Sequence, residues 1–284
     1  MNKIPSNSLE RSVAADLAGI ADRLSRRALE VTTPVYRTGE HGTPESEGTG
    51  VLFALGGIRF LLTAAHVLEH LHDGGLTAQA GGVLAYIGGD VTYLYDASRR
   101  SSDEDLVDIR IVRLAGQDWM ATPLDRFLQW DELDHEPPSP QRHAFALLGY
   151  PWSKQPRGPQ GTEMEAYAYR VLGLECESAT YEQLGANPQV SLLIGFDKGH
   201  TWGPEGQLTA PDLYGASGCG LWRFGRRIRE AVRPPRLSAI GVRWERQGRV
   251  KHVRGTRITP ILAAIAQRYA DARSTIEQHL HGAA

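Results

Sequence analysis

The sequence has few cysteines. Of its 284 residues, only Cys176 and Cys219 carry a thiol, which is too few for a disulfide framework in a chain of this length. Such a chain must be held together by the burial of apolar side chains, and it fits a reducing compartment. We therefore expect a sizeable hydrophobic core without disulfide support.

Long apolar runs and a strong net charge are absent as well. No apolar run approaches the roughly 20 residues of a membrane span. The first residues, MNKIPSNSLERS, lack the apolar core of a secretion signal, so we expect a cytoplasmic protein. The formal net charge of -2 gives no field that would draw the whole molecule to nucleic acid or anionic lipid. We therefore expect neither a membrane nor a nucleic acid as partner.

The residues that turn the chain are abundant, with 31 glycines and 16 prolines. Between them lie short apolar runs, a pattern that favours many short strands over long helices. The pair Gly56 and Gly57 predicts a tight hairpin. We expect an all-β fold of the sandwich or barrel type. The predicted strands are 50–55, 58–63, 83–87, 91–95, 109–114, 144–148, 167–174, 190–194, 220–224 and 237–242.

Two helices are expected at the ends of this β region. Apolar residues recur at helical spacing between Ser8 and Leu29, and a second helical pattern begins near Pro260. A proline-rich stretch divides the β region into halves of similar length. The predicted organisation is a helical extension at 1–30, a first β unit at 31–130, a linker at 131–142, a second β unit at 143–258, and a C-terminal helix and tail at 259–284.

Three short segments carry the residue types that nucleophilic catalysis requires. TAAHV contains His66 where a strand ends, VDIRIVRL contains Asp108 where a strand begins, and GASGCGLW contains Ser217 between two glycines. General-base chemistry needs a base, an acid that orients the base, and a nucleophile. Small residues around the serine allow neighbouring backbone N–H groups to converge on one point.

The order His, Asp, Ser along the chain is that of chymotrypsin-type proteases. The three segments resemble the motifs of the chymotrypsin/trypsin-like serine peptidase family, in its intracellular or bacterial branch. AIGVRW resembles the strand that lines the substrate cleft, and TRITPILAAI resembles the closing strand and C-terminal helix. The resemblance covers about residues 31–270. It implies two six-stranded antiparallel β-barrels, with His66 and Asp108 from the first and Ser217 from the second.

The resemblance also implies a mechanism. Ser217 would attack a peptide carbonyl, His66 would act as the base, and Asp108 would orient the imidazole. The backbone N–H groups of Gly215 and Ser217 would form the oxyanion hole. The reaction needs no cofactor, and the implied partner is a protein or peptide substrate. Related cytoplasmic single-domain proteins often act with a regulatory partner protein.

Two positions near the serine depart from the family pattern. Many members have an aspartate directly before the serine that captures a new N-terminus after cleavage, but this chain has Ala216. Activation by N-terminal trimming therefore has no anchor. Cys219 stands in place of a usual glycine, and we expect a small buried side chain there, not a nucleophile.

The resemblance defines the specificity pocket less well. Pro211, six residues before Ser217, takes the position at the base of the pocket, and Asp212 follows it. A carboxylate at Asp212 would attract Lys or Arg in the substrate. The expected substrate-binding residues are Pro211, Asp212 and Tyr214.

Other interpretations are weaker. An α/β-hydrolase would need G-x-S-x-G around the serine, but this chain has Cys219 at the last position of that motif. It would also need an acid and a histidine after the serine. The available pairs all lie close to the C-terminus, namely Glu245 with His252, and Asp271 with His279 or His281. His66, His70 and His72 could bind a metal, but no H-E-x-x-H motif is present, and we expect no metal. The arginine-rich segment 224–236 is expected to be an exposed solubilising loop, with a contact to nucleic acid or to an acidic protein as the alternative.

The main rival from a different functional class is a catalytically silent trypsin-like scaffold, used as a binding or sensing module. The three triad residue types favour an enzyme, but they do not establish an assembled cleft. Asp103 and Asp105 remain the alternatives to Asp108 as the acid that orients His66.

Overall fold

The computed structural model describes residues 26–39, 44–73, 75–80, 83–94, 107–135, 143–151, 169–196, 201–203, 206–208, 212–224, 234–247 and 250–281. Within these ranges, residues 26–30 are helical, at the end of the predicted N-terminal helix. The predicted features outside these ranges are residues 8–25 of that helix, residues 136–142 of the linker, residues 225–233 of the arginine-rich segment, Asp103, Asp105 and Pro211.

The first sheet is antiparallel and contains seven strands in the order β5-β4-β1-β2-β3-β7-β6. This is one strand more than the family resemblance implies. The strands β2, β3, β5, β6 and β7 lie on predicted segments, whereas β1 and β4 do not. The bounds are β1 (Thr32–Thr38), β2 (Pro44–Leu55), β3 (Ile58–Ala64), β4 (Leu76–Ala80), β5 (Val83–Tyr86), β6 (Gly89–Leu94) and β7 (Ile109–Leu114).

Strand β1 contains Pro34, which explains why it is hard to recognise. Proline has no N–H to donate to a sheet ladder, so its presence argues against an interior strand. In the structure Pro34 lies just outside the pairing of β1 with β4, which runs from Val35 opposite Ala78 to Arg37 opposite Leu76. The proline is tolerated because this short pairing does not include it.

The first sheet curls until its two edges meet. Strands β5 and β6 are at opposite ends of the strand order, yet only Ile87 and Gly88 separate them along the chain. The N–H of Ile87 donates to the carbonyl of Leu76 at 2.8 Å, and the carbonyl of Gly88 accepts from the N–H of Ala115 at 3.0 Å. Two consecutive residues thus form hydrogen bonds near the two opposite edges of the sheet, which closes it into a curl.

The second sheet is antiparallel and contains six strands in the order β10-β15-β14-β13-β8-β9. It also curls, because a bridge between Glu175 and Ile194 joins the end of β9 to β10. A small hairpin of β11 (Thr201–Gly203) and β12 (Gly206–Leu208) lies apart from it in the strand pairing. The bounds are β8 (Ala144–Gly149), β9 (Tyr169–Leu174), β10 (Ser191–Gly195), β13 (Gly220–Phe224), β14 (Arg236–Gln247) and β15 (Val250–Arg257).

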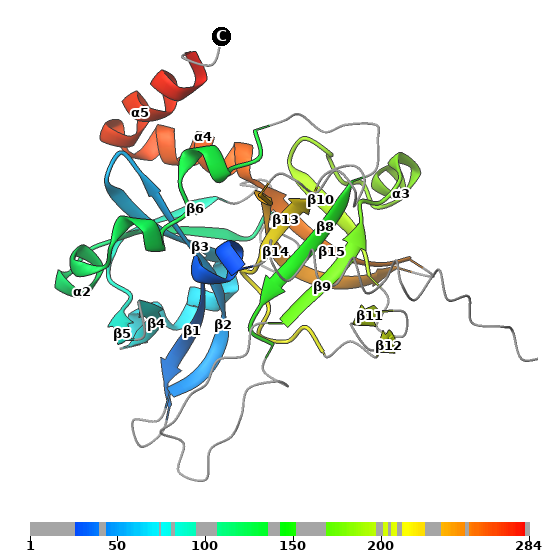
Figure 1. The fold of residues 1–284 in the computed structure, drawn as a ribbon, viewed down its shortest axis with the longest axis horizontal. Coiled ribbons are helices and arrows are strands. Elements are labelled where there is room, and N and C mark those ends of the chain that lie inside the picture. Colours follow the sequence, from blue (N-terminus) through cyan, green and yellow to red (C-terminus); the bar gives the residue numbers. More distant parts are fainter. Residues whose placement is uncertain are drawn as a thin grey trace, which may run out of the picture.

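The two curled sheets lie side by side, the first in blue to cyan and the second mostly in green to orange (Figure 1). A shared apolar core joins them, with Phe53 and Ile111 from the first sheet packed in one cluster with Trp222 and Ile240 from the second. Each sheet also encloses a core of its own. The architecture is the predicted all-β fold, with curled antiparallel sheets and few helices.

Short helices occupy the connections. They are the 3-10 helix η2 (Ala65–Asp73), α2 (Gln117–Ala121), the 3-10 helices η3 (Leu124–Arg126) and η4 (Trp130–Glu132), and α3 (Ser178–Gln183). The segment that contains α2, η3 and η4 connects the two sheets. No helix among the described residues is long and apolar enough to cross a membrane.

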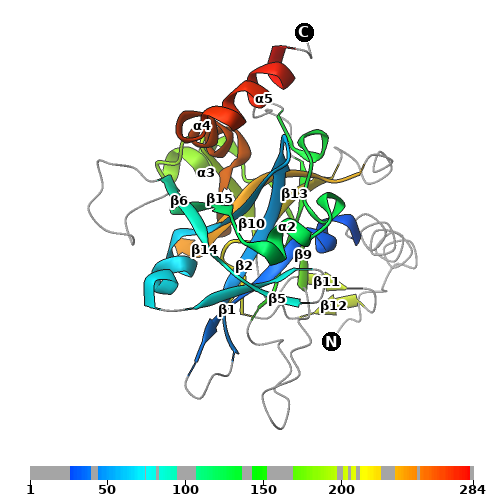
Figure 2. The ribbon, with the colours of Figure 1, turned by 90° about the vertical axis from the view of Figure 1, so that its left-hand side faces the viewer.

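The predicted C-terminal helix is present as α4 (Ile258–Arg268), followed by α5 (Ala270–His281). Helix α4 buries Ile261, Leu262 and Ile265 against the shared core, as their helical spacing predicts. It contacts β6 and β7 of the first sheet and β14 and β15 of the second. The two helices lie together at one end of the molecule (Figures 1 and 2).

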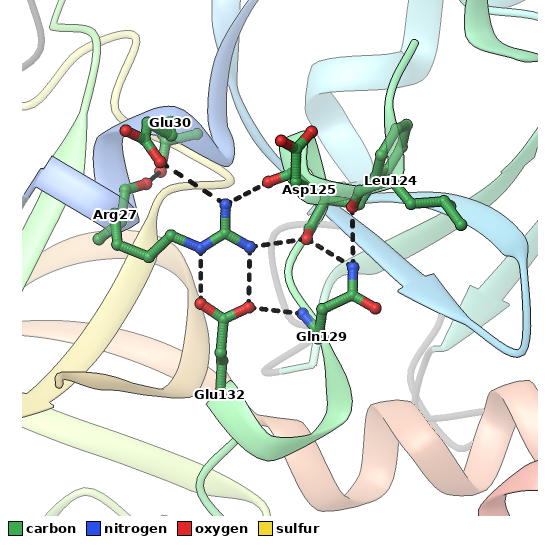
Figure 3. Close-up of polar contacts among 9 residues, drawn as sticks. Arg27, Glu30, Leu124, Asp125, Gln129 and Glu132 are labelled. Carbon is green, nitrogen blue, oxygen red and sulfur yellow. Dashed lines mark hydrogen bonds and ion pairs between the residues drawn. The ribbon is translucent and has the colours of Figure 1, made fainter. Parts of the chain in front are cut away.

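Arg27 fixes the end of the N-terminal helix to the segment between the sheets (Figure 3). Its guanidinium forms a two-pronged contact with Glu132, Nε to Oε1 at 2.6 Å and Nη2 to Oε2 at 2.9 Å. It also donates to the carbonyls of Asp125 and Phe127. The Glu132 carboxylate accepts the N–H of Gln129 at 2.8 Å, which completes the contact. A planar fork of donors suits this bidentate geometry.

Candidate active site

His66 and Asp108 lie at adjacent ends of two paired strands. In the antiparallel pairing of β3 with β7, Ala64 lies opposite Ile109, so the residues that follow Ala64 and precede Ile109 emerge together. The N–H of Ala65 continues the contact by donating to the carbonyl of Asp108 at 2.8 Å. This register brings together two side chains that are 42 positions apart in the sequence.

The His66 side chain binds the Asp108 carboxylate directly. Nδ1 of His66 is 2.6 Å from Oδ2 of Asp108. The imidazole is 40% exposed, whereas the Asp108 side chain is only 5% exposed. With Nδ1 held by the buried carboxylate, Nε2 is the ring nitrogen available to a reactant, as a general base requires.

Asp108 has an unusual backbone conformation. Among the described non-glycine residues it is the one with a positive φ, 29°. Such values cost most side chains free energy, and Asp and Asn tolerate them best. Strain of this kind often accompanies functional sites. Here it accompanies the turn that aims the carboxylate at His66.

Ser217 lies on a loop made of two consecutive tight turns. The N–H of Ala216 donates to the carbonyl of Leu213 at 2.8 Å, and the N–H of Cys219 donates to the carbonyl of Ala216 at 2.9 Å. Gly215 and Gly218 have φ values of 86° and 85°, which favour glycine. A Cβ at Gly218 would also overlap the carbonyl oxygen of Thr49. The two glycines around the serine are therefore needed for the shape of the loop.

This loop is bound to the first sheet next to His66. The N–H of Thr49 on β2 donates to the carbonyl of Ser217 at 2.8 Å. At neighbouring Gly48, an added Cβ would lie 3.1 Å from the same carbonyl and 2.6 Å from a methyl group of Val67. Val67 follows His66 directly, so the serine loop and the histidine turn meet over β2. Within the described part of the chain, no hydrogen bond joins Ser217 Oγ to His66, a contact that is often long without substrate.

Within residues 215–219, the backbone N–H groups of Gly215 and Ser217 have no hydrogen-bond partner among the described residues. The N–H groups of Ala216, Gly218 and Cys219 are all bonded to backbone carbonyls. Most buried backbone donors in proteins are paired. Two unbonded donors on alternate residues around a serine have the chemistry of a site for a developing negative charge.

Ala216 and Cys219 are both buried, at 3% and 2% exposure. Burial raises the pKa of the Cys219 thiol to about 12, so the nucleophilic thiolate form is suppressed at neutral pH. Cys219 packs as a small apolar side chain in the core of the second sheet.

The residues predicted to bind substrate differ in their placement. Pro211 is outside the described residues, while Asp212 is exposed and Tyr214 is 70% exposed. Because Asp212 is exposed, it does not lie at the buried base of a pocket. The choice of Lys or Arg as the preferred substrate residue thus stays a prediction.

The structure also bears on the α/β-hydrolase and metal-site interpretations. An α/β-hydrolase has a mostly parallel sheet, whereas both large sheets here are antiparallel, so this fold is excluded. Glu245 and His252, considered as its acid and histidine, are cross-strand neighbours on β14 and β15, with Oε2 and Nε2 3.2 Å apart. No group of three potential metal-binding side chains occurs among the described residues, which do not include the side chains of His70 and His72.

Sequence reasoning missed two threonines that connect the sheets at this site. Thr49 binds the serine loop, as described above. Thr256 on β15 is fully buried, and its hydroxyl donates to the carbonyl of Val107, directly before Asp108, at 2.7 Å. A threonine in a strand is too common to indicate such a role. For Thr49, the flanking glycines in the segment GTG were the one available signal.

Comparisons with known proteins bear on the fold. No family model and no curated protein matches the chain. Neuropsin, described as a serine protease expressed in the limbic system of mouse brain, is similar in structure with a TM-score of 0.53 and 15% identity, over 85% of this chain and 95% of that one. A mutant of human heparin binding protein (CAP37) has a TM-score of 0.54 and 11% identity, over 86% and 94%. The chain therefore has the chymotrypsin-like fold.

Proposed function

We propose that this protein is a serine endopeptidase that cleaves protein substrates by acyl transfer. The observation that carries the proposal is the 2.6 Å contact between Nδ1 of His66 and the buried carboxylate of Asp108, beside the Ser217 loop. The fold supports it, because neuropsin, which is similar in structure, is described as a serine protease. Fold alone does not determine activity, so the proposal depends on the site.

The reaction would proceed in two halves. Ser217 Oγ attacks the peptide carbonyl while His66 Nε2 takes its proton, and Asp108 stabilises the resulting imidazolium. The negative charge on the carbonyl oxygen is bound by the N–H groups of Gly215 and Ser217. His66 then returns the proton to the leaving amine, which leaves an acyl group on Ser217. Water, deprotonated by His66, then attacks this acyl group. The bond from the acyl carbon to Ser217 Oγ breaks, His66 returns the proton to Oγ, and the carboxylic acid is released.

Two further parts of the proposal concern regulation and setting. Ala216 supplies no carboxylate to receive a new N-terminus, which supports the branch of the family that is not activated by N-terminal trimming. We also propose a cytoplasmic setting, since the cysteines are few, and a regulatory partner protein that completes the site. The rival function is a silent binding scaffold, because a mutant of human heparin binding protein has a similar fold.

Labelling with a fluorophosphonate separates enzyme from scaffold. Ser217 Oγ should displace fluoride from phosphorus, with His66 taking the hydroxyl proton, and mass spectrometry should locate the adduct on Ser217. Ser217→Ala should abolish labelling, while Ser274→Ala should not, because Ser274 is an exposed serine of α5.

Peptide hydrolysis tests the same assignment. Ser217→Ala and His66→Ala should each lower turnover on the order of 10⁶-fold, and the double variant should lose hardly more, because the residues act as one unit. Equal rates for wild type and Ser217→Ala, with and without candidate partner proteins, and no adduct under any condition would favour the scaffold.

A further inference from the structure

We propose that Thr49 is the positioning residue that holds the N–H groups of Gly215 and Ser217 in place for the reaction, an inference that rests on the proposed function. Thr49 belongs to the first sheet and does not contact the reacting atoms in the proposed mechanism. It would act through the loop of the second sheet that carries the nucleophile.

All polar atoms of Thr49 are engaged at this junction, and its side chain is fully buried. Its N–H donates to the carbonyl of Ser217 at 2.8 Å, and its hydroxyl donates to the carbonyl of Gly215 at 2.9 Å. The hydroxyl also accepts the N–H of Tyr150 at 3.0 Å. The carbonyl of Thr49 accepts the hydroxyl of Thr63 at 2.6 Å. One residue thus binds two carbonyls of the serine loop and is itself fixed from both sheets.

These bonds determine which way the loop peptides face. The carbonyls of Gly215 and Ser217 point to Thr49, and the N–H groups of Ala216 and Gly218 donate to other backbone carbonyls. The peptides after Gly215 and after Ser217 are therefore held at both their oxygen and their nitrogen. Within residues 215–219, the N–H groups left unbonded in the described part of the chain are those of Gly215 and Ser217, the donors that the proposed reaction needs.

The Thr49 hydroxyl is the part of this arrangement that can be removed alone. Gly215 has no Cβ, so its peptides can rotate with little steric resistance. Without the hydroxyl, the Gly215 carbonyl loses its partner, while the N–H of Thr49 still holds Ser217. We therefore expect the loop to stay attached. The Gly215 N–H belongs to the peptide before Gly215, and it should lose its fixed orientation because the peptide after Gly215 no longer restrains rotation about this residue. Preorganised donors of this kind contribute strongly to turnover, and a misplacement of about 1 Å can cost about 10²-fold.

The test compares Thr49→Val, Thr49→Ser and Thr33→Val in the full chain. Valine keeps the shape of threonine and removes the hydroxyl, whereas serine keeps the hydroxyl. Thr33 is the matched control, because it is a buried threonine of the same sheet whose hydroxyl donates to a backbone carbonyl, that of Gln79, at 2.9 Å. The readouts are the rate constant for fluorophosphonate labelling of Ser217, kcat and KM for a cleaved peptide, melting temperature, and amide exchange of residues 213–219.

Thr49→Val should lower the labelling rate constant and kcat by about 10- to 100-fold and change KM by less than about twofold. Its amide exchange at residues 213–219 should be faster than in wild type. Thr49→Ser should stay within about threefold of wild type, since the hydroxyl is retained. Thr33→Val should lower the melting temperature without changing the rate constant or this exchange.

The role of Thr49 would be overturned if Thr49→Val had the same labelling rate constant, kinetic parameters and amide exchange as wild type. It would also be overturned if Thr49→Ser lost as much rate as Thr49→Val. A different result is possible, in which fluorophosphonate never labels the wild-type protein but amide exchange at residues 213–219 is faster in Thr49→Val. This result would retain Thr49 as the residue that orders the loop, and it would overturn the peptidase function instead. The exchange measurement thus separates the two failures.

Discussion

Asp108 combines two demands in one residue, a carboxylate against His66 and a backbone with φ of 29°. Asparagine tolerates this φ and keeps the side-chain shape, but it cannot stabilise the imidazolium and favours the wrong imidazole tautomer. We expect Asp108→Asn to lower kcat by roughly 10⁴-fold and to change the free energy of unfolding by less than about 1 kcal/mol. Peptide hydrolysis and urea unfolding measure the two effects. A large loss of stability with normal kcat would contradict the assignment.

Cys219 makes stability depend on alkaline pH. Burial raises the pKa of its thiol from 9.0 to about 12, so the unfolded state releases its proton at lower pH than the folded state. The free energy of unfolding is therefore unaffected by this thiol below pH 9 and falls as pH rises toward 12. The fall is about 1 kcal/mol between pH 9 and pH 10. Urea unfolding at pH 8, 9 and 10 should show this decline in wild type and a smaller one in Cys219→Ala. Equal declines in both proteins would show that other groups cause it.

At the scale of elements, the contact between Arg27 and Glu132 holds the helical residues 26–30 against the segment that connects the sheets (Figure 3). The Arg27 side chain is 29% exposed, so water weakens this ion pair relative to a buried one. Its hydrogen bonds to Glu132 and to two carbonyls remain, and we expect Arg27→Met to lower the free energy of unfolding by about 1–2 kcal/mol.

The control for that prediction is Arg26→Met, since Arg26 is the exposed neighbour in the same turn. Urea unfolding should show little change for this variant. Arg27→Lys should behave more like Arg27→Met than like wild type, because lysine cannot form the two-pronged contact. If Arg26→Met were as damaging as Arg27→Met, the effect would belong to the helix and not to the contact.

The whole molecule contains two curled sheets, and neither Cys176 nor Cys219 forms a disulfide. The proposed reaction uses only side chains and backbone groups of the chain. We expect the rate of peptide hydrolysis to be unchanged by dithiothreitol and by EDTA. Loss of activity in EDTA and its recovery with zinc would instead favour a metal at His66, His70 and His72.

The sequence by itself determined the all-β fold, most of the strands and the C-terminal helix. These features depend on local patterns, namely glycine and proline between short apolar runs and the helical spacing of Ile261, Leu262 and Ile265. It also contained the three segments that resemble the triad motifs, because a catalytic residue needs a particular local turn that leaves a short signature. Strand β1 was missed because its proline argues against a strand when the partner strands are unknown.

Only the tertiary structure decided how the segments meet. The register of β3 against β7 brings Asp108 to His66, and Thr49 binds a loop 166 positions further along the chain. Both contacts depend on which strands become neighbours and on how each sheet curls. These are properties of long-range packing, to which a single threonine adds almost no local pattern. For this reason the triad candidates were visible in the sequence, whereas the residue that holds the serine loop against the first sheet was not.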